Sequence, residues 1–208
     1  MIFSISLACI TGLAIGLLFQ QSRSACSPKC RSNFLTKVSE TDEDGNIFIG
    51  QIDNNGKRQE HGILVWAQLG MTYDGYWKDN SRVGIGELIW SDGHRYKGQW
   101  KDNERSGLGV MQWPNGQRYI GAWLNNRQYG EGIQFYPDGQ MYRGTWQNDL
   151  RSGLGIQIET DGAKYEGQWW SDMKDGNGTY TDKDGNKIVG IWKSDALHTV
   201  LLNVTLEL

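Results

Sequence analysis

Apolar and polar residues alternate in short stretches along most of this chain. The stretch YKGQW at residues 96–100 places its tyrosine, glycine and tryptophan on one side and its lysine and glutamine on the other. This is the period of a β-strand with one buried face. A polar run follows at 101–106, then a second apolar stretch, GLGVMQW, at 107–113, and then Pro-Asn-Gly at 114–116. Turn-forming residues on both sides of the second stretch predict a β-hairpin.

The pattern returns every 23 residues. The phrase Tyr-x-Gly-x-Trp begins at Tyr73, Tyr96, Tyr119, Tyr142 and Tyr165, and Ile188 takes the next place. A degraded copy begins at Phe48. A fixed period of this size is typical of repeat architectures, in which each unit packs only against its neighbours. We therefore predict an all-β, elongated single-layer stack of six to seven β-hairpins over residues 45–192.

Each unit also carries paired glycines, such as Gly107 and Gly109, and closes with Asp-Gly or Asn-Gly. Asparagine and glycine tolerate positive φ, so the closing dipeptides predict tight turns. Glycine at a fixed place in a strand indicates that a large ring of the adjacent unit lies against bare backbone. The tryptophans of the repeated phrase, Trp123 among them, are therefore expected to be mainly structural.

The two ends differ from the array. Residues 1–20 are apolar, and the first nineteen carry no charge, which favours a hydrophobic helix acting as a membrane anchor or a cleaved signal peptide. Residues 21–44 form a basic and polar linker, and its basic residues would keep an anchored array on the cytoplasmic side. The alternation at residues 193–208 predicts one last strand that caps the stack.

Small features of the first thirty residues carry further hypotheses. Gly12 and Gly16 form a GxxxG spacing that would let two membrane helices pair as a homodimer. Cys26 and Cys30 are candidates for lipidation in a cytoplasmic protein and for a disulfide in an exported one, and two free thiols remain the alternative.

Charge and motif content argue against several functions. Residues 1–39 hold four basic and no acidic residues, whereas the rest holds 17 basic and 24 acidic residues, a net charge of −7. An acidic array is a poor partner for nucleic acid. The three histidines have no metal-ligand spacing, and no nucleophile, base and stabiliser can be assembled. We expect no enzyme activity, no metal and no cofactor.

The repeated unit resembles the MORN (membrane occupation and recognition nexus) repeat, with its Tyr-x-Gly-x-Trp, polar loop, Gly-x-Gly and closing Asp-Gly. The resemblance covers about residues 48–192. It implies a stack of hairpins with an aromatic-lined concave face that attaches to proteins or membranes. Glu159 and Asp182 depart from the pattern, since earlier units carry an aromatic residue there. These departures weaken the aromatic lining toward the C-terminal end.

These observations favour a membrane-tethered, single-pass scaffold whose repeats bind a protein partner in the cytoplasm. Four rings near the ends of the second strands are candidate partner-binding residues, or alternatively core residues: Trp90, Trp113, Phe135 and Tyr136. One alternative is an exported or cell-surface module, secreted after signal cleavage, that recognises a polypeptide or a glycan. A weaker alternative is a regulatory subunit of a separate enzyme.

Overall fold

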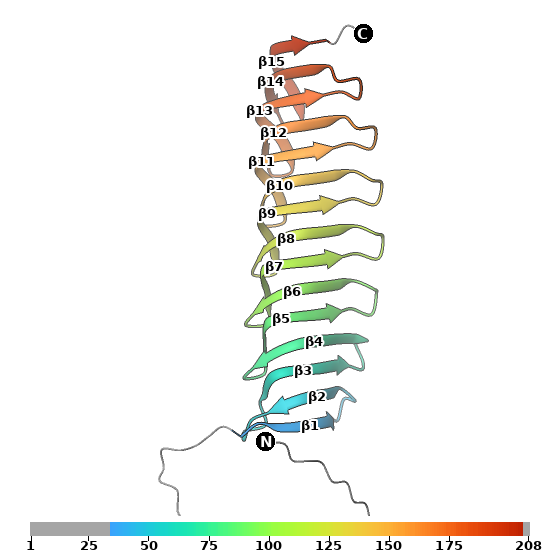
Figure 1. The fold of residues 1–208 in the computed structure, drawn as a ribbon, viewed down its shortest axis with the longest axis vertical. Coiled ribbons are helices and arrows are strands. Elements are labelled where there is room, and N and C mark those ends of the chain that lie inside the picture. Colours follow the sequence, from blue (N-terminus) through green and yellow to red (C-terminus); the bar gives the residue numbers. More distant parts are fainter. Residues whose placement is uncertain (1–33, 206–208) are drawn as a thin grey trace, which may run out of the picture. The chain divides into compact units, whose positions relative to one another are not determined.

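A computed structural model of the chain describes residues 34–205. These residues form a single antiparallel sheet of 15 strands, in which every strand pairs with its neighbours in sequence (Figure 1). The part of the chain that is described contains no helix. The all-β prediction is therefore confirmed for this part, whereas the hydrophobic helix expected at 1–20 lies outside the described residues, as do Gly12, Gly16, Cys26 and Cys30.

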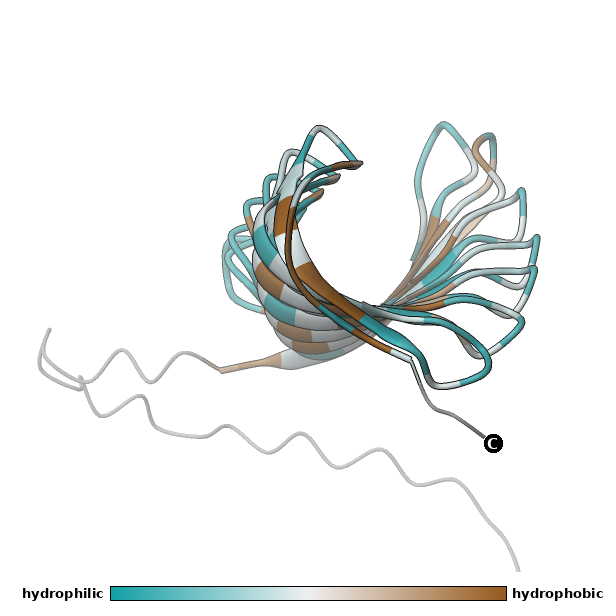
Figure 2. Cartoon of the chain, turned by 90° about the horizontal axis from the view of Figure 1, so that it is seen from above, coloured by the Kyte–Doolittle hydropathy of each residue, from teal (hydrophilic) through white to brown (hydrophobic). Residues whose placement is uncertain are grey.

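The strands are as follows: β1 Thr36–Thr41, β2 Ile47–Ile52, β3 Arg58–Trp66, β4 Met71–Lys78, β5 Ser81–Ile89, β6 Arg95–Lys101, β7 Glu104–Gln112, β8 Arg118–Leu124, β9 Arg127–Phe135, β10 Met141–Gln147, β11 Leu150–Ile158, β12 Lys164–Trp170, β13 Met173–Thr181, β14 Lys187–Lys193 and β15 Ala196–Val204. Seen along the stack, the sheet is bent into an open trough whose two rims are made of the turns (Figure 2).

One rim consists of two-residue hairpin turns. Between β6 and β7, Asp102 and Asn103 have φ values of 49° and 70°. Two successive positive φ values define a type I′ turn, whose twist matches that of antiparallel strands. The polar run expected as a loop at 101–106 is thus shorter than its composition indicates, because residues from Glu104 onward already belong to β7.

The same turns tie each hairpin to the one before it. The Asn103 main-chain N–H donates to the Arg82 carbonyl at 3.1 Å, and the Asn103 side-chain Oδ1 accepts from the Arg82 N–H at 2.9 Å. Both groups of the turn are therefore satisfied by the start of the preceding hairpin's second strand. This bonding recurs at Asn80, Asn126, Asp149, Asp172 and Asp195.

The core is a single column of rings on one face of the sheet, which we call the ring face. The Tyr96 ring meets Trp100 of its own hairpin and Trp123 of the next, with centroids 5.2 and 5.3 Å apart in edge-to-face geometry. Such geometry is the favoured one for aromatic pairs. Tyr96 is fully buried and Trp123 is 4% exposed. The column of contacts runs without interruption from Phe48 to Trp192.

The paired glycines have two separate roles, which extends the sequence-based interpretation. A side chain at Gly109 would lie 2.4 Å from the Tyr96 hydroxyl, so this glycine makes room for a ring. That ring belongs to the same hairpin. The expected ring of the adjacent hairpin also reaches this glycine, because Trp123 Nε1 donates to the Gly109 carbonyl at 3.4 Å. Gly107 instead has a φ of +73°, a conformation that other residues rarely adopt.

The ends of the array extend the predicted boundaries. β1 lies inside the range 21–44 that we expected to be a linker, so the sheet begins before residue 45. At the other end, β15 pairs with β14 and completes a seventh hairpin. All nine residues of β15 are exposed, and its outer edge has no neighbouring strand among the described residues.

Candidate binding groove

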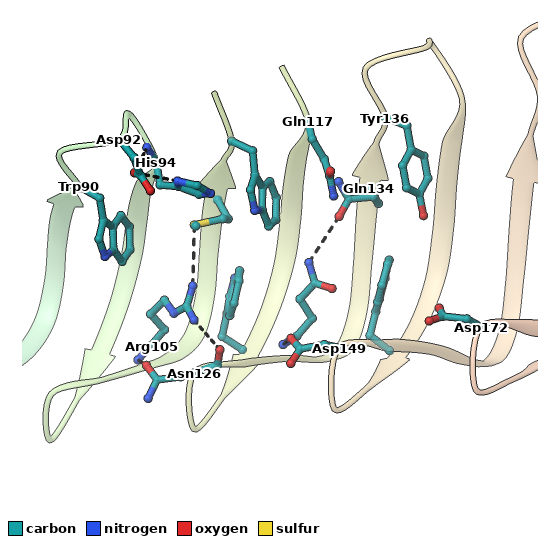
Figure 3. A pocket seen from close by; sticks show the side chains of 15 residues that line it. Trp90, Asp92, His94, Arg105, Gln117, Asn126, Gln134, Tyr136, Asp149 and Asp172 are labelled. Carbon is teal, nitrogen blue, oxygen red and sulfur yellow. Dashed lines mark hydrogen bonds and ion pairs between the residues drawn. The ribbon is translucent and has the colours of Figure 1, made fainter. Parts of the chain in front are cut away.

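Three of the four predicted rings line one cavity in the middle of the ring face (Figure 3). Trp90, Trp113 and Tyr136 follow the second strands of successive hairpins and pack, partly buried, against the ring column. The cavity has a volume of about 620 Å³. Their regular spacing in the sequence thus becomes a row along one wall of a groove.

Phe135 does not join this row. It is the last residue of β9, and it lines a different depression together with Arg118, whose guanidinium carbon lies 4.9 Å from the Phe135 ring centroid. Successive residues of an extended chain point to opposite sides. Because Tyr136 faces the groove, Phe135 cannot. The structure therefore separates these two neighbours, which the sequence grouped together.

The opposite wall is made of the type I′ turns. Asn126, Asp149 and Asp172 lie there, facing the row of rings across the groove (Figure 3). Trp123 and Trp146 of the ring column also line the cavity. The groove therefore has aromatic surface along its floor and one wall, and polar or acidic groups along the other.

A guanidinium group covers most of the tryptophans of the ring column. The Arg105 guanidinium carbon lies 4.5 Å from the Trp123 ring centroid, and its Nη2 donates to the Asn126 carbonyl at 2.7 Å. Burial lowers the pKa of Arg105, but an arginine remains charged in proteins. Arg82 and Arg151 hold the same position over Trp100 and Trp169, at 4.4 and 4.3 Å.

The central hairpin, β8 and β9, breaks this arrangement. Gln128 stands where the neighbouring repeats have arginine. Gln134 stands where the two preceding repeats have Leu88 and Met111, whereas the following repeat also has a glutamine there, Gln157. Gln128 is 7% and Gln134 is 2% exposed, which makes them the two buried polar residues of the described chain. Gln134 Nε2 donates to the Arg118 and Phe135 carbonyls, each at 3.1 Å, and Gln128 Nε2 donates to Gln134 Oε1 at 3.4 Å.

Sequence reasoning missed both glutamines, although the signal was present. Aligning the repeated units places Gln128 in register with Arg82, Arg105 and Arg151. The significance of that register depends on each arginine lying over a tryptophan of the following hairpin, which the strand pattern alone does not reveal.

The acidic groups of the groove differ in their partners. The Asp92 carboxylate accepts the main-chain N–H of His94 at 3.1 Å and lies 2.8 Å from His94 Nδ1, and these bonds lower its pKa. Asp172 pairs with Arg151 Nε at 3.2 Å. Asp149 accepts only the Gln128 N–H, at 2.7 Å, and has no cationic partner within 4.0 Å in residues 34–205.

Two further findings concern the described residues only. Within 34–205, no group of three His, Cys, Asp or Glu side chains is placed to hold a metal ion. A search of the same residues for a helix of sufficient length and apolar character to span a membrane found none. The predicted anchor at 1–20 lies outside this part of the chain.

Comparisons with known proteins were made for both sequence and structure. None of the curated proteins compared with the chain matches its sequence. Among solved structures, the SAS-4 (dCPAP) TCP domain of Drosophila melanogaster, in complex with a proline-rich motif of Ana2 (dSTIL), is 14% identical, with a TM-score of 0.43, over 83% of this chain and 99% of that chain. The wild-type TCP10 domain of Danio rerio CPAP is 15% identical, with a TM-score of 0.29, over 83% and 100%. Neither likeness bears on the function of this chain.

The family model named MORN repeat matches six consecutive segments: 54–70, 73–95, 96–118, 119–141, 142–164 and 165–187. The five full-length matches begin at the tyrosines of the repeated phrase, in the register that the sequence indicates. They cover the hairpins that build the ring column and the groove, and they confirm the resemblance on which the fold was expected. This chain belongs to the MORN repeat family.

Proposed function

We propose that the array is a non-enzymatic scaffold that binds an extended polypeptide segment of a protein partner along the groove of its ring face. The observation that carries the proposal is the row of partly buried rings, Trp90, Trp113 and Tyr136, along one cavity. Large aromatic side chains in a depression supply the few anchors that dominate protein interfaces. A MORN array suggests a repeat-based binding scaffold of this kind.

The dimensions of the groove favour an extended segment over a helix. Neighbouring strands are ~4.8 Å apart, so successive hairpins advance the groove by ~10 Å. An extended chain rises ~3.3 Å per residue, so about three residues span one hairpin. Every third side chain of a bound segment would therefore meet the same position of the next repeat, whereas a helix covers the same distance in about seven residues.

A photoreactive amino acid tests this placement. A fragment beginning at residue 33 keeps β1 intact, which a fragment beginning at residue 40 would cut. With the photoreactive group at Gln117, on the groove rim, the partner should be captured and the cross-linked peptide should be an extended segment. The same group at Leu154, which lies outside the groove and is 68% exposed, should capture little.

Substitutions test the anchors directly. Trp113→Ala and Tyr136→Ala should each weaken capture about tenfold or more, as expected for interface anchors. The matched control is Trp170→Ala, since Trp170 is 62% exposed and lies outside the groove. Equal capture by all three variants, with the array folded, would show that the groove is not the binding surface.

The proposal includes a membrane tether, supported by the sequence alone. The uncharged segment at 1–20 is followed by Arg23, Lys29 and Arg31, which favour a cytoplasmic array. Carbonate extraction should leave the full chain in the membrane pellet and release the fragment beginning at residue 33. Recovery of a soluble protein that lacks its first twenty-odd residues would instead favour the exported binding module.

A further inference from the structure

The repeats provide an internal template for how this groove holds a cation. In three hairpins an arginine of the chain lies over a tryptophan of the next hairpin, with 4.3 to 4.5 Å between the guanidinium carbon and the ring centroid. In each of them, arginine Nη2 also donates to the carbonyl of the second turn residue, at 3.0, 2.7 and 2.6 Å. The template therefore consists of an indole face and one main-chain carbonyl.

At Trp146 the same parts are present but the cation is missing. Gln128 occupies the arginine position, and its amide turns to Gln134 rather than to the turn carbonyl of Asp149. Gln128 ends in a short neutral amide where arginine extends into a charged planar group. Trp146 thus lacks the covering guanidinium that Trp123 and Trp169 have, and the Asp149 carbonyl lacks the donor that Asn126 and Asp172 have.

The second turn residue adds a charge where the cation is missing. Asn103 and Asn126 are neutral and face arginines of the chain. Asp172 is acidic and pairs with Arg151. Asp149 is acidic and faces the neutral Gln128, so its carboxylate forms no ion pair within 4.0 Å in residues 34–205, and its charge acts on Arg105 from farther away. A carboxylate beside an indole face that carries no cation attracts a cation by both charge and ring quadrupole.

The position that lacks a cation lines the groove. Gln128, Trp146 and Asp149 line the same cavity of about 620 Å³ as Trp113 and Tyr136. Trp146 is 4% exposed, and its Nε1 has no hydrogen-bond partner in the described chain, unlike Nε1 of Trp100 or Trp169, which donate to glycine carbonyls. The Trp146 ring therefore lacks one contact that Trp100 and Trp169 have. It is as buried as Trp123, at 4% each, so a guanidinium reaches its face when the neighbouring Gln128 side chain, which lines the same cavity, moves aside.

We infer that this position is a subsite for an arginine side chain of the bound polypeptide. This inference rests on the proposed function, since it names a side chain of the segment held in the groove. The guanidinium plane would lie over Trp146, with one N–H on the Asp149 carbonyl and another on the Asp149 carboxylate. Arginine is favoured over lysine because a planar fork reaches both oxygens while it stacks on the ring.

The position also fixes the register of the segment. An arginine over Trp146 lies between the rings of Trp113 and Tyr136 on one wall and Asp172 on the other. With about three residues per hairpin, apolar side chains suited to Trp113 and Trp90 would occur about three and six residues from the arginine. The subsite thus predicts a motif of one arginine and two apolar residues at that spacing.

The first test uses the full chain and two small probes. Nα-acetyl-arginine amide should shift the indole N–H resonance of Trp146 saturably, with a Kd on the order of millimolar for a single side chain. Nα-acetyl-citrulline amide has nearly the same shape without the charge, and it should bind about tenfold more weakly. Equal binding of the two probes, or no saturable shift with arginine, would overturn the subsite.

Two substitutions define the site further. Gln128→Arg should supply the missing guanidinium from the chain itself, abolish arginine binding and raise Tm by about 2–4 °C, as expected for roughly one cation–π contact in a domain of this size. Asp149→Asn should keep the turn, because asparagine holds the equivalent place at Asn103 and Asn126, and should weaken arginine binding several-fold. Asp195→Asn, at a remote turn, should leave binding unchanged.

The outcomes separate this inference from the scaffold on which it rests. If Gln128→Arg and Asp149→Asn still bind arginine like the natural chain, the subsite is wrong. If both variants lose arginine binding and photo-capture at Gln117 falls with them, the subsite is supported. If capture persists in these variants but is lost in Trp113→Ala, the scaffold stands and the arginine subsite fails. If capture of the partner is unchanged in Trp113→Ala and Tyr136→Ala, the proposed scaffold function itself is wrong.

Discussion

The hairpin turn facing Arg105 and the one facing Gln128 have almost the same framework and different linings. Their turns have φ values of 50° and 69° at Asn125 and Asn126, and of 52° and 70° at Asn148 and Asp149. The rings are equally alike, since Tyr96 lies 5.3 Å from Trp123 and Tyr119 lies 5.3 Å from Trp146. Only the first of these two tryptophans is covered by an arginine.

This comparison separates the parts that build the fold from those that line the groove. The turn conformation, the glycine pair and the Tyr–Trp column recur from repeat to repeat, because each contacts the next unit and any defect would propagate to a neighbour. The arginine position contacts a neighbour on one side only and opens to the groove on the other. It can therefore change in one repeat without changing the backbone, and the chain uses that freedom at Gln128.

The largest effect should come from alkaline pH, which acts on both regions alike. Burial raises the pKa of Tyr73, Tyr96, Tyr119 and Tyr142 well above the usual 10 and that of Tyr165 to about 12. Because the folded state holds the neutral phenol, this stability is complete below about pH 10 and is lost as the pH rises above it. Tyrosine ionisation and loss of sheet ellipticity should coincide above about pH 10. Ionisation of these tyrosines near pH 10 in an intact sheet would contradict the single-column core.

Removing one ring should be the next largest effect, and it should distinguish the two regions. Trp123→Ala should lower the free energy of unfolding by about 3–5 kcal/mol, as for other buried large aromatics. Trp146→Ala should cost less, because Trp146 lacks both the guanidinium and the Nε1 hydrogen bond. Urea denaturation of the two variants gives the difference. A larger loss of unfolding free energy for Trp146→Ala than for Trp123→Ala would contradict the view that Trp146 is held by fewer contacts.

Giving the hairpin of Arg105 the glutamine that the central hairpin has at Gln128 should have a smaller effect. Arg105→Gln removes the cation over Trp123 and the bond to the Asn126 carbonyl. The expected loss is about 2 kcal/mol, since both a partly desolvated cation–π contact and a charge-assisted hydrogen bond disappear. Thermal denaturation measures it, with the surface change Lys97→Gln as control. A loss below about 0.5 kcal/mol, the surface range, would mean that the arginine does not clamp the repeat.

The smallest effect should come from the hairpin turn itself, whose conformation is the same in both regions. Asn126→Gly keeps the positive φ but removes the Oδ1 that accepts the Arg105 N–H at 2.9 Å. The expected loss is about 1 kcal/mol, the net value of one hydrogen bond. Asn125→Gly is the matched control, because Asn125 has a positive φ and no side-chain hydrogen bond is recorded for it, and it should be neutral or slightly stabilising. Equal losses of stability at both positions would show that the hydrogen bond from the Arg105 N–H to Asn126 Oδ1 does not stabilise the contact between hairpins.

Three of the four rings of the candidate site could be predicted from the sequence, and the fourth was assigned to it wrongly for a physical reason. Trp90, Trp113 and Tyr136 were found because they recur with the period of the repeat, which places them at equivalent positions of a stack. Phe135 was grouped with them because it is adjacent in the chain. Adjacent residues of an extended chain lie on opposite faces, and the sequence did not show which of Phe135 and Tyr136 faces the groove.

The sequence by itself determined the period, the strands, the tight turns and the family, because each depends on residues a few positions apart. Only the tertiary structure decided that Arg105 covers Trp123, that Asn126 bonds to Arg105 of the preceding hairpin, and that the sheet bends so that its aromatic face becomes a groove. These features depend on the register between hairpins and on the curvature of the whole sheet. Gln128 and Asp149 acquire their significance from that register, which is why the missing cation at Trp146 emerges only from the fold.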